Sequence, residues 1–324
     1  MKAWAAGLAG LLLVGAMLAS VQWGEMEARM LAVGWFGLLA LTGYRLVPVL
    51  LCAQAWHVLS PGHRALSRIA CLKARMVRDA VAMLGMILPA GGEIVGARVL
   101  ALAGLSGAEA AAMTIADVTV EMISQTLFTL LGLMALALAF PSVVPSGLIA
   151  GGLLAILAMT LGLLAVQHPK MLAWLREVGA GLVRQGGWGR WFALDGLLAA
   201  LQEQYRRPGA LAASTAVHLL AWLAGIGETW LALRLMGQPL SLTAVLAIES
   251  LVFVARSLAF FVPWAAGVME GGYLAVGSLF GLSPEIALTL SVLRRFADLF
   301  IGLPGLLFWQ LGEHRQSRVG GQGE

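Results

Sequence analysis

Charged residues are scarce in this chain of 324 residues. Only 12% of the residues are Asp, Glu, Lys or Arg, whereas 60% are hydrophobic. A soluble domain carries about 25% charged residues, because it needs them to cover its surface. The shortage of charge excludes an ordinary soluble domain, and it predicts an integral membrane protein whose helices face lipid.

Cysteine is equally rare, with only Cys52 and Cys71 in the chain. Neither belongs to a Cys-x-x-Cys pair or has a histidine at metal-ligand spacing, so we expect no disulfide framework and no metal site. The sequence also lacks a phosphate loop, a dinucleotide-binding fingerprint, a nucleophile elbow and a paired-histidine zinc motif. We therefore expect no cofactor, no catalytic residue and no enzyme activity, although intramembrane carboxylates could still act in catalysis.

Long apolar runs are what the chain does contain. A helix needs about 20 apolar residues to cross the hydrocarbon core of a bilayer. The first run could instead be a signal peptide, but Leu18-Ala19-Ser20 is a poor cleavage site. The sequence thus predicts an all-α integral membrane protein with about six transmembrane helices, over residues 3–21, 31–56, 110–140, 147–166, 210–236 and 287–310.

The cations are concentrated between these runs. Residues 57–78 contain five Lys or Arg residues and no acid, and residues 167–207 and 313–324 are also basic. By the positive-inside rule we place all three segments, and both termini, on the cytoplasmic side of a bacterial inner membrane. The tryptophans of 167–207 predict an amphipathic loop in the headgroup layer. The net charge of +4 lies in these loops, so we expect no nucleic-acid partner.

Two further apolar segments, 79–104 and 242–281, are interrupted near their middle. The interruptions are Pro89-Ala90-Gly91-Gly92-Glu93 and Pro263-Trp264-Ala265-Ala266-Gly267, the latter followed closely by Glu270. Proline and glycine break helices, and in lipid such breaks are tolerated only inside protein or beside a cavity. We expect each segment to be a re-entrant hairpin of two half-helices. The alternative is a kinked helix that crosses the membrane.

The two interrupted segments also resemble one another in sequence. If both are re-entrant, three spans separate them, so the two halves of the chain have opposite orientations. We therefore predict an inverted repeat, with residues 1–140 as the first membrane repeat and 141–312 as the second. A shift of 177 positions superposes Glu93 on Glu270, Gly104-Leu105-Ser106 on Gly281-Leu282-Ser283, and Glu121 on Asp298.

Charged side chains inside apolar runs are the candidates for function. Such a charge costs about 2.5 to 3.5 kcal/mol on the most lenient insertion scale, so it persists mainly where a partner or water compensates. Arginine forks suit a phosphate, and carboxylates suit the hydroxyls or amine of a lipid headgroup. A structural ion pair is the alternative for each of them. The candidate headgroup-binding residues are Glu93, Arg98, Glu270, Glu121, Asp298, Arg256, Arg294, Arg295 and Arg45.

Other polar residues in the apolar runs favour structural roles. His218 is alone in its run, where a hydrogen-bonded packing histidine is favoured over a proton relay. Asp117 and Glu121 share one helix face, either as part of the site or as membrane-edge anchors. The glycines of Gly91-Gly92 and Gly271-Gly272 serve close helix packing at least as often as ligand approach.

The interrupted segments carry a resemblance to a known family. Leu88-Pro89-Ala90-Gly91-Gly92-Glu93 with Arg98, and Pro263 to Glu270 with the later Leu303-Pro304-Gly305, resemble the flippase region of the lysylphosphatidylglycerol synthases. Within that family the chain looks most like the hopanoid biosynthesis-associated HpnL-type membrane proteins. The resemblance implies lipid handling, with Glu93, Arg98 and Glu270 as matching positions. It does not imply synthase activity, because the sequence has no soluble aminoacyl-transfer domain.

Together these observations predict a protein that translocates or binds membrane lipids, with hopanoids or phospholipids as substrates and lipid-biosynthesis proteins as further candidate partners. One alternative is an intramembrane enzyme that modifies lipid headgroups with its carboxylates as acid and base. Another is a non-catalytic scaffold of a lipid-biosynthesis complex.

Overall fold

The computed structural model describes residue 15 and residues 22–63, 65–84, 91–140, 146–167, 196–258 and 267–320. These residues form helices and connecting turns and contain no strand, which confirms the all-α prediction for this part of the chain. The helices are α2 (Trp23–Leu59), α3 (Arg68–Leu84), α4 (Gly91–Leu102), α5 (Gly107–Ala139), α6 (Ser146–Gln167), α8 (Leu197–Tyr205), α9 (Pro208–Leu235), α10 (Leu242–Leu258), α11 (Val268–Ser278) and α12 (Pro284–Gly320).

Three of the described helices, α2, α5 and α9, are long and apolar enough to cross a membrane. Large apolar side chains point outward from them: Trp35 and Phe36 of α2 are 79% and 90% exposed, and Leu138 of α5 is 76% exposed. Such a surface is unfavourable in water and suits lipid. The chain is thus a multi-pass membrane protein. Except for Gly15, the predicted span 3–21 lies outside the described residues, so the count of six stays a prediction.

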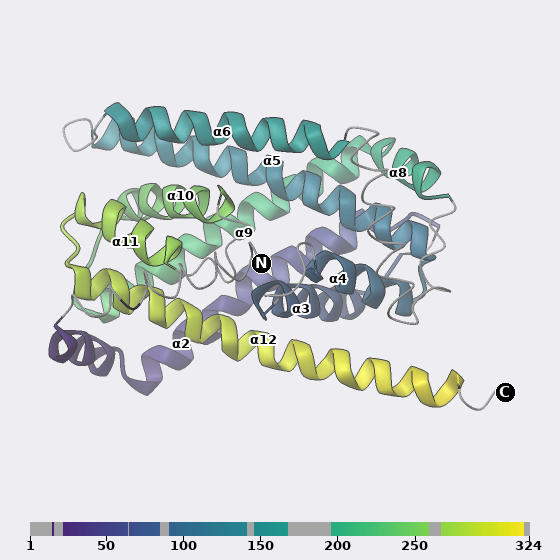
Figure 1. Cartoon of the computed structure of the whole chain (residues 1–324), viewed down its shortest axis with the longest axis horizontal. Helices are drawn as coiled ribbons and strands as arrows, with labels where there is room; N and C mark the ends of the chain where they lie inside the picture. Colours follow the sequence, from purple (N-terminus) through teal and green to yellow (C-terminus); the bar gives the residue numbers. More distant parts are fainter. Residues whose placement is uncertain are drawn as a thin grey trace.

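The long helices run roughly along the longest axis of the molecule, with α5 and α6 side by side at one edge and α12 at the opposite edge (Figure 1). Helices α2 and α9 pack on one another between these edges. Helix α2 is kinked at Gly34, whose φ of 59° is non-helical, and it also contains Pro48. The core of the bundle is therefore built around α2 and α9.

Each of the interrupted segments folds back on itself. Helices α3 and α4 pack against one another, as do α10 and α11. With 17 and 12 residues in the first pair and 17 and 11 in the second, each helix is shorter than the roughly 20 residues of a span. Figure 1 shows α3 and α4 toward one end of the bundle and α10 and α11 toward the other. The two helices of each interrupted segment therefore form a folded-back pair and not one continuous kinked helix.

The packing contacts occur in matched pairs. Helix α5 packs on α10 as α12 packs on α3, and α5 packs on α9 as α12 packs on α2. Likewise, α4 packs on α5 as α11 packs on α12. Together these matches relate α2 to α9, α3 to α10, α4 to α11, and α5 to α12. We refer to residues 23–139 as the first half and residues 208–320 as the second half.

The turns before α5 and α12 are built alike. Both contain the sequence Gly-Leu-Ser, at residues 104–106 and 281–283. The two glycines have positive φ angles of 115° and 78°, a conformation that favours glycine. The two leucines are each 5% exposed, and each serine hydroxyl accepts a hydrogen bond from a backbone N–H of the following helix. The shared tripeptide thus performs the same three tasks in both halves.

Helix α3 begins earlier than the sequence indicated. Residues 57–78 were expected to be a cytoplasmic loop, but α3 begins at Arg68, and Arg75 is only 4% exposed. The loop prediction is therefore wrong for residues 68–78. Arg75 and Arg78 can be buried because carboxylates of α4 and α5 pair with them. A count of basic residues does not reveal such partners.

Other predicted boundaries differ less. Of the predicted amphipathic loop 167–207, residues 168–195 lie outside the described residues, and α8 covers 197–205. Helix α12 continues to Gly320, so most of the predicted basic tail 313–324 is helical. The glycine at position 92 packs closely, since a Cβ there would lie 2.6 Å from the carbonyl oxygen of Arg78. This supports the packing role predicted for that glycine.

Candidate functional site

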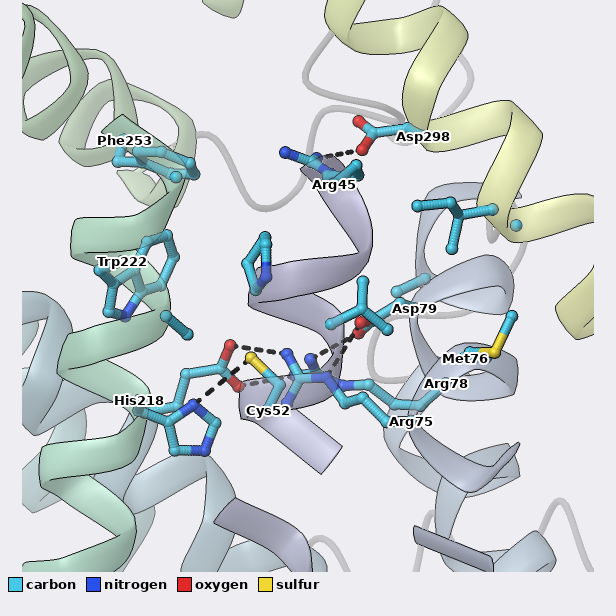
Figure 2. Close-up of a pocket in the computed structure, with 18 of the residues that line it drawn as sticks. Arg45, Cys52, Arg75, Met76, Arg78, Asp79, His218, Trp222, Phe253 and Asp298 are labelled. Atoms are coloured by element: carbon cyan, nitrogen blue, oxygen red, sulfur yellow. Dashed lines mark hydrogen bonds and ion pairs between the residues drawn. The ribbon is translucent and has the colours of Figure 1, made fainter. Parts of the chain in front are cut away.

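A cavity of about 510 Å³ lies where the two halves meet. Its wall comes from α2, α3, α4 and α5 of the first half and from α9, α10, α11 and α12 of the second. Among the described residues six arginines and four carboxylates line it, so this part of the wall carries more cations than anions. Figure 2 shows part of it, with α3 on one side and Trp222 and Phe253 on the other. The charged lining residues are Arg45, Arg75, Arg78, Arg256, Arg294, Arg295, Asp79, Glu93, Glu121 and Asp298.

Arg75 joins α3 to α5 through buried ion pairs. Its Nη2 lies 3.0 Å from Glu121 and its Nη1 lies 3.4 Å from Asp117, both on α5. Its Nε donates to Asp79, one turn along α3, at 2.9 Å. Asp117 is 1% exposed, so loss of Arg75 would remove a compensating charge from a buried carboxylate. The network fixes α3 against α5 beside the cavity.

Arg78 lies one turn further along α3 and reaches α4. Its Nη2 lies 2.9 Å from Glu93 and 3.2 Å from Glu121. Glu93 is the third residue of α4, and its side chain is 28% exposed at the cavity wall. Arg78 therefore holds the start of α4 while leaving part of the Glu93 carboxylate accessible.

Arg294 forms the corresponding network in the second half. Its Nη1 donates to Glu249 at 2.6 Å, to Thr229 at 2.7 Å and to the Tyr273 hydroxyl at 3.0 Å. Tyr273 and Thr229 in turn each donate to Glu249 at 2.7 Å. Arg294 is 3% exposed and Glu249 is 1% exposed. This buried ion pair joins α12 to α10, and its hydrogen bonds to Tyr273 and Thr229 connect it to α11 and α9.

The two networks occupy equivalent places with their charges exchanged. Arg75 and Glu249 each follow the first residue of α3 or α10 by seven positions. Asp117 and Arg294 each follow the first residue of α5 or α12 by ten positions. The cation lies on α3 in the first half, whereas it lies on α12 in the second. Equivalent positions in the two halves thus carry a buried ion pair of opposite polarity.

Arg45 of α2 connects the two halves directly. Its Nη1 lies 2.8 Å from Glu228 of α9, and its Nη2 forms an ion pair with Asp298 of α12. Figure 2 shows the Arg45 and Asp298 pair at one side of the cavity. Because α2 belongs to the first half, this bridge couples the halves at the cavity wall.

Arg256 of α10 differs from the other lining arginines. Within the described part of the chain no carboxylate pairs with it, and its guanidinium lies 5.9 Å from the Phe253 ring centre. Phe253 packs edge to face on Trp222, with ring centres 4.6 Å apart. Both aromatic rings also line the cavity. Arg256 thus presents a positive charge to the cavity beside an aromatic surface.

Glu270 lies behind the cavity wall and not on it. Its carboxylate accepts from Arg295 at 2.8 Å, from Ser291 at 2.9 Å and from the backbone N–H of Gly267 at 2.9 Å. Glu270 is 6% exposed, whereas Arg295 lines the cavity. The carboxylate therefore caps the start of α11 and orients Arg295.

Seven of the nine predicted headgroup-binding residues line the cavity. The other two, Glu270 and Arg98, are buried outside the wall, with Arg98 4% exposed within α4. That any of the nine contacts a headgroup stays a prediction. Glu93 pairs with Arg78, which is not among the nine.

Sequence reasoning missed several residues of the wall. Arg75 and Arg78 were assigned to a loop, and Cys52 and His218 were assigned no role in the site. The spacing of Arg75 and Asp79, four positions apart, is a helix signal that could have placed α3 correctly. His218 is hydrogen-bonded to Asp117 at 2.8 Å. In the part of the chain that the structure describes, no His, Cys, Asp and Glu cluster could hold a metal ion.

The charged cavity is thus enclosed by helices of both halves of a membrane protein. Comparison with known proteins then gives its family. No curated protein and no solved structure matches the chain. The model of one family, described as the lysylphosphatidylglycerol synthase TM region, matches residues 3–305. The chain belongs to the lysylphosphatidylglycerol synthase TM region family.

Proposed function

We propose that this chain binds a membrane lipid by its headgroup and moves it across a bacterial inner membrane, in which both termini are cytoplasmic. The observation that carries the proposal is the charged cavity between the two halves, which both folded-back helix pairs border. Membership of the family supports a lipid-related role. Translocation itself needs no covalent chemistry, so this proposal does not depend on whether the chain also has an enzyme activity.

In this proposal the two halves form an inverted repeat, and the pairs α3–α4 and α10–α11 are re-entrant hairpins from opposite leaflets. The matched helix contacts and the matched Gly-Leu-Ser turns support this interpretation. Transporters of this plan bind their substrates near the midplane, where half-helix ends meet, and expose the site alternately by rocking of one half against the other. The bridge from Arg45 to Asp298 is one contact that such rocking would rearrange.

The wall favours a lipid with an anionic, phosphate-bearing headgroup. Arginine binds phosphate oxygens through paired, charge-assisted hydrogen bonds, and Arg256 has no carboxylate partner among the described residues. The partly exposed carboxylate of Glu93 suits a hydroxyl or an amine of the same headgroup. We therefore propose a phospholipid substrate, with a hopanoid that carries a polar headgroup as the alternative.

The size of the cavity suits a headgroup. Pockets for small ligands span about 300 to 1,000 Å³, and this cavity measures about 510 Å³. Burying a headgroup there would leave the acyl chains in the bilayer, beside the apolar outer faces of the helices. Lateral entry between the helices follows from this arrangement.

The test is transbilayer transfer of a fluorescent phosphatidylglycerol in proteoliposomes, measured by chemical quenching of the outer leaflet. We expect Arg256→Gln to lower the transfer rate at least tenfold. Arg234→Gln is the matched control, because Arg234 also lies over an aromatic ring, 4.8 Å from Trp230, but not on the cavity wall. Transfer by Arg256→Gln at the wild-type rate would contradict the proposed role.

The scaffold alternative makes a different prediction in the same assay. A scaffold of a lipid-biosynthesis complex would show no protein-dependent transfer with the wild-type chain. It would be affected by changes on the outer surface and not by changes in the cavity. Protein-dependent transfer that is lost on changing Arg256 argues against that alternative.

A further inference from the structure

A cysteine, a histidine and an aspartate are aligned at the cavity wall. Cys52 Sγ of α2 lies 3.8 Å from His218 Nδ1 of α9, and His218 Nε2 lies 2.8 Å from Asp117 Oδ1 of α5. Figure 2 shows the Cys52 thiol directed at the imidazole ring. The three residues come from three helices, so their alignment is a product of the fold.

The three residues are arranged as a nucleophile (Cys52), a base (His218) and a group that orients the base (Asp117). In the neutral tautomer in which His218 donates its Nε2 proton to Asp117, the lone pair of Nδ1 faces the thiol. Asp117 is held in place by an ion pair with Arg75 of α3. Transfer of the thiol proton to His218 would generate the thiolate, which is the reactive form of cysteine.

The position of the thiol also suits a reaction with lipid. Cys52 and His218 both line the cavity, and Cys52 is partly exposed. Cys71, the second cysteine of the chain, is fully buried and does not line the cavity. A lipid bound by its headgroup at this wall brings its glycerol ester bonds into the same region of the membrane.

We propose that Cys52 is a nucleophile that accepts an acyl group from an ester-linked phospholipid in the cavity. The sulfur–carbon bond forms as the ester carbon–oxygen bond breaks. The thiol proton passes to His218 and then to the departing alkoxide, which leaves as the hydroxyl of a lysophospholipid. Water then hydrolyses the thioester to a fatty acid and restores the thiol, so that no oxidant or reductant is needed. Asp117 is a positioning residue for His218.

The inference rests on the proposed function in one respect, that a phospholipid enters the cavity. Wild-type protein is reconstituted in vesicles of phosphatidylglycerol and phosphatidylethanolamine with deuterated acyl chains, and transfer is measured in parallel. We expect intact mass spectrometry to show one deuterated acyl adduct that hydroxylamine removes, together with released lysophospholipid. The adduct should persist in Cys71→Ala and disappear in Cys52→Ala. Transfer without an adduct would overturn this inference alone, whereas no transfer would contradict the proposed function.

A second measurement avoids any change to His218. The rate of iodoacetamide alkylation is compared between Cys71→Ala, which keeps only Cys52, and a variant that combines Cys52→Ala, Cys71→Ala and Val49→Cys. Val49 lines the same cavity on α2. We expect Cys52 to react at least tenfold faster, and equal rates would overturn the proposal.

The role of Asp117 is tested by the pH profile of the same alkylation. The groups that face His218 are Asp117 and Glu121 of α5 and Cys52 of α2. We expect Asp117→Asn to change the pH midpoint of Cys52 alkylation, because His218 loses its charged partner. A slower reaction with an unchanged midpoint would reduce Asp117 to a structural residue and contradict its positioning role.

Discussion

Arg294 of α12 donates a hydrogen bond of 2.6 Å to Glu249 of α10, and both side chains are buried. A buried charge without its partner is strongly destabilising, by about 3 to 5 kcal/mol. We therefore expect Glu249→Gln to lower the thermal unfolding temperature of the purified protein in detergent.

The control for this prediction is the exposed pair of Arg29 and Glu25, which lie 3.4 Å apart on α2. Exposed pairs contribute about 0 to 1 kcal/mol, so Glu25→Gln should leave the unfolding temperature nearly unchanged. Equal unfolding temperatures for Glu249→Gln and the wild type would mean that the buried pair does not stabilise the fold.

The exchanged polarity of the two buried networks predicts a rescue. In the first half the cation, Arg75, is on the helix before the break, and the anion, Asp117, follows on α5. We expect Glu249→Arg or Arg294→Asp alone to prevent correct folding. The two changes combined should restore folded protein in part, because they copy the polarity of the first half. Folded yield by size-exclusion chromatography checks this, and a double variant no better than either single one would refute it.

The close approach of α3 and α4 makes Gly92 sensitive to any side chain. A Cβ at Gly92 would lie 2.6 Å from the carbonyl oxygen of Arg78 and 2.8 Å from the Cβ of Ala82. Overpacking of this kind costs about 1 to 3 kcal/mol, so Gly92→Ala should lower the unfolding temperature. Gly43→Ala on α2 is the control, since a Cβ there meets nothing within 4 Å. Similar unfolding temperatures for the two variants would show that α3 and α4 separate easily.

Variants of Glu93 and Glu270 distinguish a role in transport from a role in folding. Glu93 is partly exposed at the cavity, and its partner Arg78 also pairs with Glu121. Glu93→Gln should therefore lower lipid transfer at least tenfold with little change in unfolding temperature. Glu270 lies behind the wall and caps α11, so Glu270→Gln should lower the unfolding temperature as well as transfer. Wild-type transfer by Glu93→Gln would remove that carboxylate from the site.

Composition and the Gly/Pro breaks predicted the membrane class and both folded-back segments, because hydrophobicity and helix breaking act locally along the chain. The pairing of charges could not be predicted in the same way. The shift of 177 positions aligned Glu93 with Glu270, yet Arg78 of α3 binds the first and Arg295 of α12 binds the second. The two halves are therefore alike in the positions of their helices. The ion-pair partner of each glutamate depends instead on which side chain of another helix lies beside it.

The alignment of Cys52 with His218 and Asp117 shows the same limit. These three residues are far apart in the sequence and lie on different apolar helices. Each is unremarkable by itself in its run, and a single sequence contains no spacing signal that links them. Only the packing of α2, α5 and α9 brings them together.

The central claim is that a lipid headgroup occupies the cavity between the halves. The most direct measurement is photolabelling of the wild-type protein in proteoliposomes with a phosphatidylglycerol that carries a diazirine on its headgroup, followed by peptide mass spectrometry. We predict labels on cavity-lining residues of α5, such as Val118 and Met122, and on Val49 of α2. Labels confined to outward-facing residues such as Trp35 and Leu138, with none on the cavity wall, would contradict the account.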